Sequence, residues 1–155
     1  WFHKRRFKKN FNKCQIEIIM GKVLKSHIAK RKVKKCIKND EYDIDLREYS
    51  EMDDEAAFVL AECEKALDLR DLEVLTDKAA EYLTTHKKSI GLAKVYDLSE
   101  TAAKFLADKR SFIHFEMPTI TENFAKIFAA GTARLKMTHL KWFLRTKNKI
   151  ITHTY

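Results

Sequence analysis

The chain has 155 residues, of which 45% are hydrophobic, so it is long enough to form one domain with a substantial core. Three glycines and one proline exclude collagen-like and low-complexity classes, and three scattered cysteines argue against a disulfide framework and favour a reducing compartment. No apolar run reaches the roughly 18 residues that a spanning helix needs, so the sequence predicts a soluble or peripheral protein.

The net charge of +9 is distributed unevenly along the chain. Residues 1–38 carry fourteen Lys or Arg and one acid, residues 39–101 carry seven against eighteen, and residues 102–155 carry ten against three. A surface that is merely soluble intersperses both signs. The segregation therefore indicates that the first segment faces a polyanion.

Residues 1–38 are predicted to form a basic arm, extended or helical, in which aromatic side chains that can stack on unpaired bases are interleaved with the first cations. Three interpretations are open: a solvated disordered tail, a membrane-surface anchor, and a nucleic-acid-binding segment, which is preferred. The residues predicted to contact RNA are Lys4, Arg5, Arg6, Lys8, Lys9, Lys13, Lys30, Arg31, Lys32, Lys34 and Lys35.

Residues 39–50 are acidic and are predicted to be an extended linker that enters a domain spanning residues 51–155. Ser50 is expected to cap a first helix that runs from about Glu51 to Leu69. A second helix is predicted to follow Asp71 and to end near the cations of residues 86–88.

A short helix is predicted to begin at Ser99, after which the apolar period changes to two. Residues 112–120 and 124–137 alternate, with a bulge expected at Ala129-Ala130-Gly131, and residues 140–155 are expected to complete an antiparallel meander. The predicted fold is therefore α+β, with two to three N-terminal helices packed on a curved, cone-like antiparallel sheet.

The sequence contains no P-loop, no dinucleotide-binding glycine motif, no His-Glu-x-x-His and no Cys-x-x-Cys pair, and its six histidines lack metal-ligand spacing. Glu116 is a candidate catalytic carboxylate, but its alternation with Phe115 and Met117 predicts that it faces outward. Cys63 is expected to be a small core residue. The sequence therefore predicts no enzyme activity, no cofactor or metal, and no small-molecule substrate.

The predicted order of elements resembles a mitochondrial large-ribosomal-subunit protein of the family related to the C-terminal domain of the import motor's membrane-anchoring subunit, the Tim-forty-four-like family. The resemblance spans about residues 28 to 150. The stretches that carry it are Asp43-Ile-Asp-Leu-Arg-Glu-Tyr, Ala56 to Leu83, Lys104-Phe105-Leu106, Phe112-Ile-His-Phe, Thr121-Glu-Asn-Phe-Ala and Thr132-Ala-Arg-Leu.

This resemblance implies a cone of curved sheet and helices without enzyme activity. It further implies a translation component in the mitochondrial matrix, a structural ribonucleoprotein that contacts ribosomal RNA and neighbouring ribosomal proteins. Near the polypeptide exit it would help to hold the ribosome at the inner membrane or an insertase. The alternative that it leaves open is a peripheral inner-membrane adaptor of the import-motor type, and a third hypothesis is a small pocket enzyme on the same cone.

Overall fold

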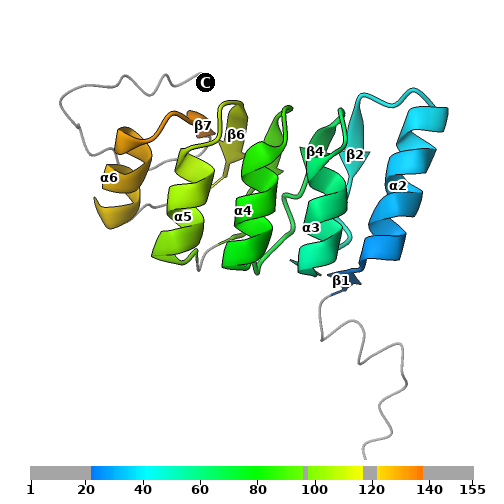
Figure 1. The fold of residues 1–155 in the computed structure, drawn as a ribbon, viewed down its shortest axis with the longest axis horizontal. Coiled ribbons are helices and arrows are strands. Elements are labelled where there is room, and N and C mark those ends of the chain that lie inside the picture. Colours follow the sequence, from blue (N-terminus) through cyan, green and yellow to red (C-terminus); the bar gives the residue numbers. More distant parts are fainter. Residues whose placement is uncertain (1–21, 96–97, 117–121, 138–155) are drawn as a thin grey trace, which may run out of the picture.

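The structure, a computed structural model, describes residues 22–95, 98–116 and 122–137. Helices and strands alternate along these residues (Figure 1). The helices are α2 Ser26–Lys38, α3 Asp54–Ala61, α4 Asp77–Thr85, α5 Glu100–Ala107 and α6 Glu122–Ala130. The strands are β1 Val23–Leu24, β2 Asp43–Asp45, β3 Glu51–Met52, β4 Ala66–Asp68, β5 Ile90–Leu92, β6 Phe112–Phe115 and β7 Arg134–Met137.

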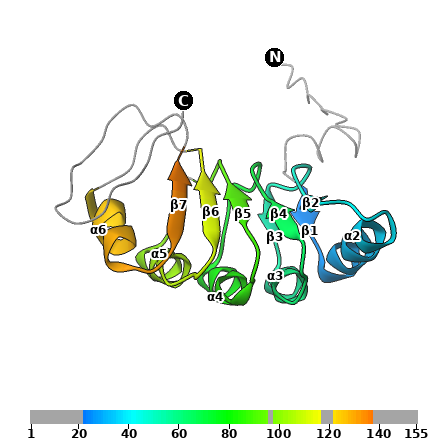
Figure 2. The same ribbon diagram turned by 90° about the horizontal axis from the view of Figure 1, so that it is seen from above.

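The main sheet has five parallel strands in the order β2-β4-β5-β6-β7. The alternating, parallel arrangement is Rossmann-like, but the strand order follows the chain without reversal, and the helices all lie along one face of the sheet (Figure 2). We call the other face, which no described helix covers, the open face. Each strand–helix unit packs mainly on the next, as in a solenoid.

The core of the array repeats every 23 residues. Ile44, Leu67, Ile90 and Ile113 occupy one register row of the sheet and are at most 2% exposed. A second buried row, one pleat further along, consists of Leu46, Leu69, Leu92 and Phe115. A unit of this length that contributes one strand and one helix is the construction of leucine-rich-repeat solenoids.

Helices α3, α4 and α5 repeat with the same period. Each begins with a polar side chain that accepts a hydrogen bond from the backbone three residues later: Asp53, Thr76 and Ser99. Each helix then presents two adjacent buried alanines and a buried leucine to the sheet and its neighbours. Small side chains at these positions let the helices lie close together along one face. The repeated positions are Ala56-Ala57-Leu60, Ala79-Ala80-Leu83 and Ala102-Ala103-Leu106.

The caps also link neighbouring helices. Thr76 Oγ1 donates to Asp54 Oδ1 on α3 at 2.6 Å, and Ser99 Oγ donates to Asp77 Oδ1 on α4.

We expect Ser99→Ala to lower the free energy of unfolding by about 1 to 2 kcal/mol, because the variant loses the cap of α5 together with the hydrogen bond to Asp77. Urea titration measures the change. Thr101→Ala, on the exposed side of α5, is the control and should be neutral or slightly stabilising, and equal losses in the two variants would contradict the role of the cap.

The predicted antiparallel α+β sheet is wrong. The strands of the main sheet are all parallel, and residues 124–130, which were predicted to be part of a strand with a bulge, belong to helix α6. Phe124 and Phe128 lie one helical turn apart in α6 and both contact Phe115. The alternation in this segment was therefore a misread helical pattern. Residues 138–155, and residues 117–120 of the strand predicted at 112–120, lie outside the described residues.

The first predicted helix is also wrong in extent, since it is interrupted by the turn that leads into β4, and its cap is Asp53 rather than Ser50. The second helix begins at Asp77, later than predicted. The helix cap at Ser99, the strand that begins at Phe112 and the burial of Cys63 are confirmed.

Candidate nucleic-acid interface

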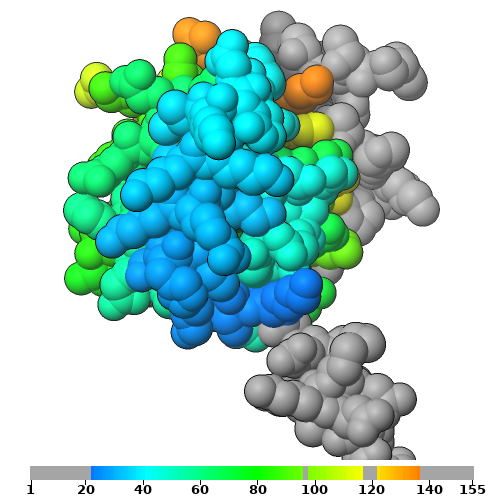
Figure 3. Space-filling view, turned by 90° about the vertical axis from the view of Figure 1, so that its right-hand side faces the viewer, coloured from blue at the N-terminus to red at the C-terminus, as the bar shows by residue number. Residues whose placement is uncertain are grey.

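Helix α2 closes one end of the array. Ala29 and Cys36 lie on its inner side, where they are at most 1% exposed, and the helix packs on α3. The Cys36 thiol also donates to the carbonyls of Glu41 and Asp43 at the start of β2. These contacts fix the orientation of α2, and Figure 3 looks onto this end of the molecule.

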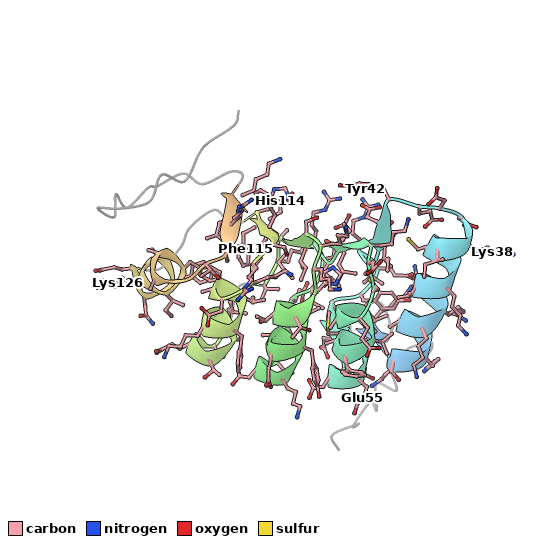
Figure 4. All side chains as sticks on the ribbon, turned by 45° about the horizontal axis from the view of Figure 1, so that its top comes forward. Lys38, Tyr42, Glu55, His114, Phe115 and Lys126 are labelled. Atoms are coloured by element: carbon pink, nitrogen blue, oxygen red, sulfur yellow. The ribbon has the colours of Figure 1, made fainter. Side chains whose placement is uncertain are left out.

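The outward side of α2 is basic. His27, Lys34 and Lys38 lie on the side opposite Ala29 and Cys36, at intervals of seven and four residues. Three further exposed cations flank this row. Figure 4 shows Lys38 at the outer end of the array, far from Lys126 on α6. We define the α2 basic face as the five exposed Lys and Arg residues Lys30, Arg31, Lys34, Lys35 and Lys38.

None of the five cations of the α2 basic face forms an ion pair with a carboxylate of the described residues. The neighbouring Lys22 and Lys25 do form such pairs, with Glu48 and Asp53. The helix also has no acid in its first turn. The described residues therefore do not neutralise the positive charge of this face, and the charge is available to a binding partner.

Lys32 differs from the other predicted RNA contacts in α2. Its Nζ lies 2.6 Å from Glu48 Oε1, donates to the Asp45 carbonyl, and sits 5.8 Å from the centre of the Tyr49 ring. The hydrogen bond to Glu48 raises the pKa of Lys32. This lysine thus attaches α2 to the loop after β2, whereas Lys38, which was not predicted, joins the outward face.

The remaining predicted contacts, Lys4, Arg5, Arg6, Lys8, Lys9 and Lys13, lie outside the described residues. Of the five that the structure describes, four come together on the outward side of α2, and Lys32 is the exception.

The open face carries a row of ion pairs that begins beside β2 and extends to the residue after β6. Arg47 bonds to Asp45 at 2.8 Å and lies 3.4 Å from Asp68, while Arg70 bonds to Asp68 at 2.7 Å and lies 3.9 Å from Glu116. The hydrogen bonds from Arg47 lower the pKa of Asp45 to about 2, and those from Arg70 lower the pKa of Asp68. A general acid near neutral pH needs a raised pKa, so these two carboxylates are unsuited to that role.

Next to this row lies a shallow polar groove of about 460 Å³, lined by Lys32, Asp45, Arg47, Glu48 and Asp71. Lys32 pairs with Glu48, Arg47 pairs with Asp45, and Asp71 pairs with Lys94 outside the groove, so the groove offers few unpaired groups to a ligand. Among the described residues no group of three His, Cys, Asp or Glu side chains could hold a metal ion. The helices of that part of the chain include none that is long and apolar enough to cross a bilayer.

A second polar feature is buried at the turns between helices and strands. Lys109, which is fully buried, donates its Nζ hydrogen to the His86 carbonyl one repeat earlier. His86 is 2% exposed, and neither of its ring nitrogens has a hydrogen-bond partner within the described residues. Burial and the nearby Lys109 lower the pKa of His86 to about 4, although the carbonyls around residues 60–65 oppose the shift. Burial lowers the pKa of Lys109 to about 8.

This second feature has a structural role. Ser111 Oγ donates to the Lys88 carbonyl, and Thr132 Oγ1 donates to the Asp108 carbonyl, so side chains of one turn repeatedly satisfy the backbone of the preceding turn. Lys109 does the same for His86. The α2 basic face is therefore the stronger candidate for a functional surface.

No family model, curated protein or solved structure matches this chain.

Proposed function

We propose that this protein is a non-catalytic adaptor that binds RNA through the α2 basic face and carries the repeat array as a rigid body behind it. The observation that supports this proposal is the set of five exposed cations on one side of a fixed helix, without ion pairs to described carboxylates. Phosphate groups of a nucleic acid present the complementary density of negative charge.

Anionic lipid is the second partner with suitable charge, at about 1 kcal/mol per cation near a membrane surface. A helix that lies in a membrane interface also needs a free apolar side. The apolar side of α2 is already used, because Ala29 and Cys36 are buried in the array, and the exposed Ile37 is a single residue. RNA is therefore the partner that α2 fits better.

The ribosomal, mitochondrial and inner-membrane parts of the sequence-based prediction remain predictions. They came from a resemblance that implied an antiparallel cone, and the sheet is parallel. The RNA-binding part has separate support, since it rests on the charge and exposure of α2.

The proposal is tested by removing three charges from one side of α2. We expect Lys30→Gln/Lys34→Gln/Lys38→Gln to bind a fluorescein-labelled RNA oligonucleotide roughly 100-fold more weakly at about 0.1 M salt, because each lost phosphate contact contributes about 0.7 to the salt slope for single strands. The slope of log affinity against log salt should fall by about 2. Fluorescence anisotropy measures both quantities.

The matched control is Lys78→Gln/Lys104→Gln/Lys126→Gln. It removes the same charge from the helical side of α4, α5 and α6, where Lys104 and Lys126 pair with Glu100 and Glu122. Equal weakening by the two triple variants would refute the α2 interface. Binding to phosphatidylserine vesicles without binding to RNA would instead support the membrane adaptor.

Substitution is preferable to truncation in this test. A chain that starts at Asn39 would lack α2 altogether and would expose the side of α3 that α2 covers. Loss of binding in such a chain would not separate lost charge from lost structure.

A further inference from the structure

The open face carries an exposed aromatic ring at its β6–β7 end. Phe112 is 50% exposed, whereas Ile113 and Phe115 on the same strand are fully buried against the helices. Figure 4 labels Phe115 and His114 on this strand, and the alternation along it places Phe112 and His114 together on the open face. An exposed phenyl ring on a sheet is a ready platform for a second flat group.

One cation contacts this ring, and further basic residues lie nearby in the sheet. Arg134 on β7 is the register partner of Phe112, and its guanidinium lies 5.6 Å from the ring centre. Lys136 is the register partner of His114. Arg110 lies two residues before Phe112, and the carbonyl of Lys88 accepts the hydrogen bond of the intervening Ser111, which places Lys88 near the start of the same strand.

These four cations, like those of α2, form no ion pair with a carboxylate in the part of the chain that the structure describes. The other end of the open face carries Asp43, Asp45 and Asp68, of which Asp45 and Asp68 pair with Arg47 and Arg70. The register row that contains Phe112 and Arg134 at one end thus begins with Asp43 at the other, and the charge of the face changes sign along the sheet. A polyanion would therefore be attracted more strongly to the β6–β7 end, where the one described carboxylate that follows β6, Glu116, lies 3.9 Å from Arg70.

We propose that the β6–β7 end of the open face binds unpaired bases of a single-stranded nucleic acid. Phe112 would stack on a base, and Arg134 and Lys136 would contact the flanking phosphates. A ring half open to solvent and bordered by cations combines the two contacts that single strands offer, a π-face and a phosphate. An acidic peptide would use the cations but would leave the flat ring without a stacking partner.

This second surface goes beyond the α2 basic face, which offers contacts to phosphate and no aromatic platform among its described side chains. The two surfaces lie at opposite ends of the array and are separated by the acidic strands β2 and β4 (Figure 1). They therefore predict different preferences, since phosphates are present in both duplex and single-stranded RNA, while stacking on Phe112 requires an unpaired base.

The test compares Phe112→Ala with Phe58→Ala. Phe58 is a matched control because it is 48% exposed and lies on α3, on the helical side of the array. We expect Phe112→Ala to weaken binding of a single-stranded RNA oligonucleotide roughly 10-fold and to leave binding of the corresponding duplex unchanged. An oligonucleotide that contains 2-aminopurine should lose its protein-induced fluorescence quenching in the same variant.

Thermal unfolding followed by circular dichroism verifies that both variants fold, and Phe112→Leu provides an apolar replacement without a ring if the alanine variant does not. Unchanged single-strand affinity in a folded Phe112 variant would overturn the inference, as would equal losses for single strand and duplex. Competition by polyglutamate, with no difference between Phe112→Ala and Phe58→Ala, would instead assign this surface to an acidic protein. Failure of the α2 triple variant to alter binding leaves this comparison intact, so the two proposals fail separately.

Discussion

Replacing His86 with leucine is expected to remove about 3 kcal/mol of pH dependence from the free energy of unfolding between pH 6.5 and pH 4. The pKa of His86 in the folded protein is about 4, below its ordinary value of 6.5. In this window the unfolded chain binds the proton and the folded protein does not, so stability is complete above pH 6.5 and is lost as the pH falls toward 4. Each unit of pKa difference corresponds to about 1.4 kcal/mol.

The measurement is urea unfolding at a series of pH values for the wild type and His86→Leu, with the difference between the two proteins plotted against pH. Carboxylates that titrate in the same range are present in both proteins and cancel in the difference. His27→Gln, which removes an exposed histidine from α2, is the control for the loss of a histidine as such. If the difference in unfolding free energy between wild type and His86→Leu stayed constant from pH 7 to pH 4, His86 would not be buried in its neutral form.

The neighbouring Lys109 adds a second pH-dependent contribution of the same sign at higher pH. Lys109 is fully buried and its pKa falls to about 8, so at neutral pH it remains charged in an environment that disfavours the charge. Its contribution to stability improves as the pH rises from about 8 toward 10.5, where the unfolded chain still holds the proton. In the wild type, the profile should therefore show one pH-sensitive region on the acid side from His86 and another on the alkaline side from Lys109.

Gly131→Ala is expected to lower the free energy of unfolding by about 1 to 3 kcal/mol, the usual cost of forcing extra volume into a packed site. A Cβ atom at Gly131 would lie only 2.7 Å from the carbonyl carbon of Ala107 and would also collide with the carbonyl oxygen. That oxygen accepts the hydrogen bond of the Ala133 amide at the turn into β7. The substitution would thus separate α6 and β7 from the preceding repeat.

Gly91→Ala is the matched control for this prediction. A Cβ atom at Gly91 would meet its nearest neighbour, Arg70 Cγ, at 3.4 Å, which is ordinary contact, so Gly91→Ala is expected to change stability by less than about 1 kcal/mol. Urea titration of both variants gives the comparison. If the two substitutions had the same effect, the close approach of Ala107 to Gly131 would not determine the stability of this turn.

The sequence predicted some local features of the fold and missed its topology. Ser99 could be recognised as a cap because its side chain and the following helix form a local unit. The strands of the main sheet are only three or four residues long, too short for a clear period of two, and α6 contains enough alternating apolar residues to resemble a strand. The parallel arrangement depends on contacts between residues 23 apart, which a local period does not show.

The signal that could have revealed the array was present as a repeat. Residues 44–47 read Ile-Asp-Leu-Arg and residues 67–70 read Leu-Asp-Leu-Arg, and the caps Asp53, Thr76 and Ser99 share the same interval. Self-comparison of the sequence at a period of 23 would have found both. Charge clustering predicted four outward cations of α2, but the inward position of Lys32 depends on which side of the helix packs on the array.

The charge segregation also has a partly structural origin. Several acids of residues 39–101 cap helices or occupy their first turns, as do Asp53, Asp54 and Asp77, where the helix dipole favours negative charge. Others, such as Asp68, pair with arginine on the open face. The acidic middle of the chain therefore reflects the repeat itself. On the α2 basic face, Lys35 and Lys38 lie in the last turn of the helix, where its dipole favours positive charge, but Lys30, Arg31 and Lys34 have no such explanation.

Because each repeat is held chiefly by the one before and the one after it, the array has a distinctive response to mechanical load. A pulling force applied along the row of strands would concentrate at whichever terminal unit is weakest. That unit would unfold first, and the force would then act on the next unit. Extension would therefore proceed through a series of small unfolding steps rather than one cooperative transition. A tether anchored at α2 would in this way yield gradually and could recover one step at a time.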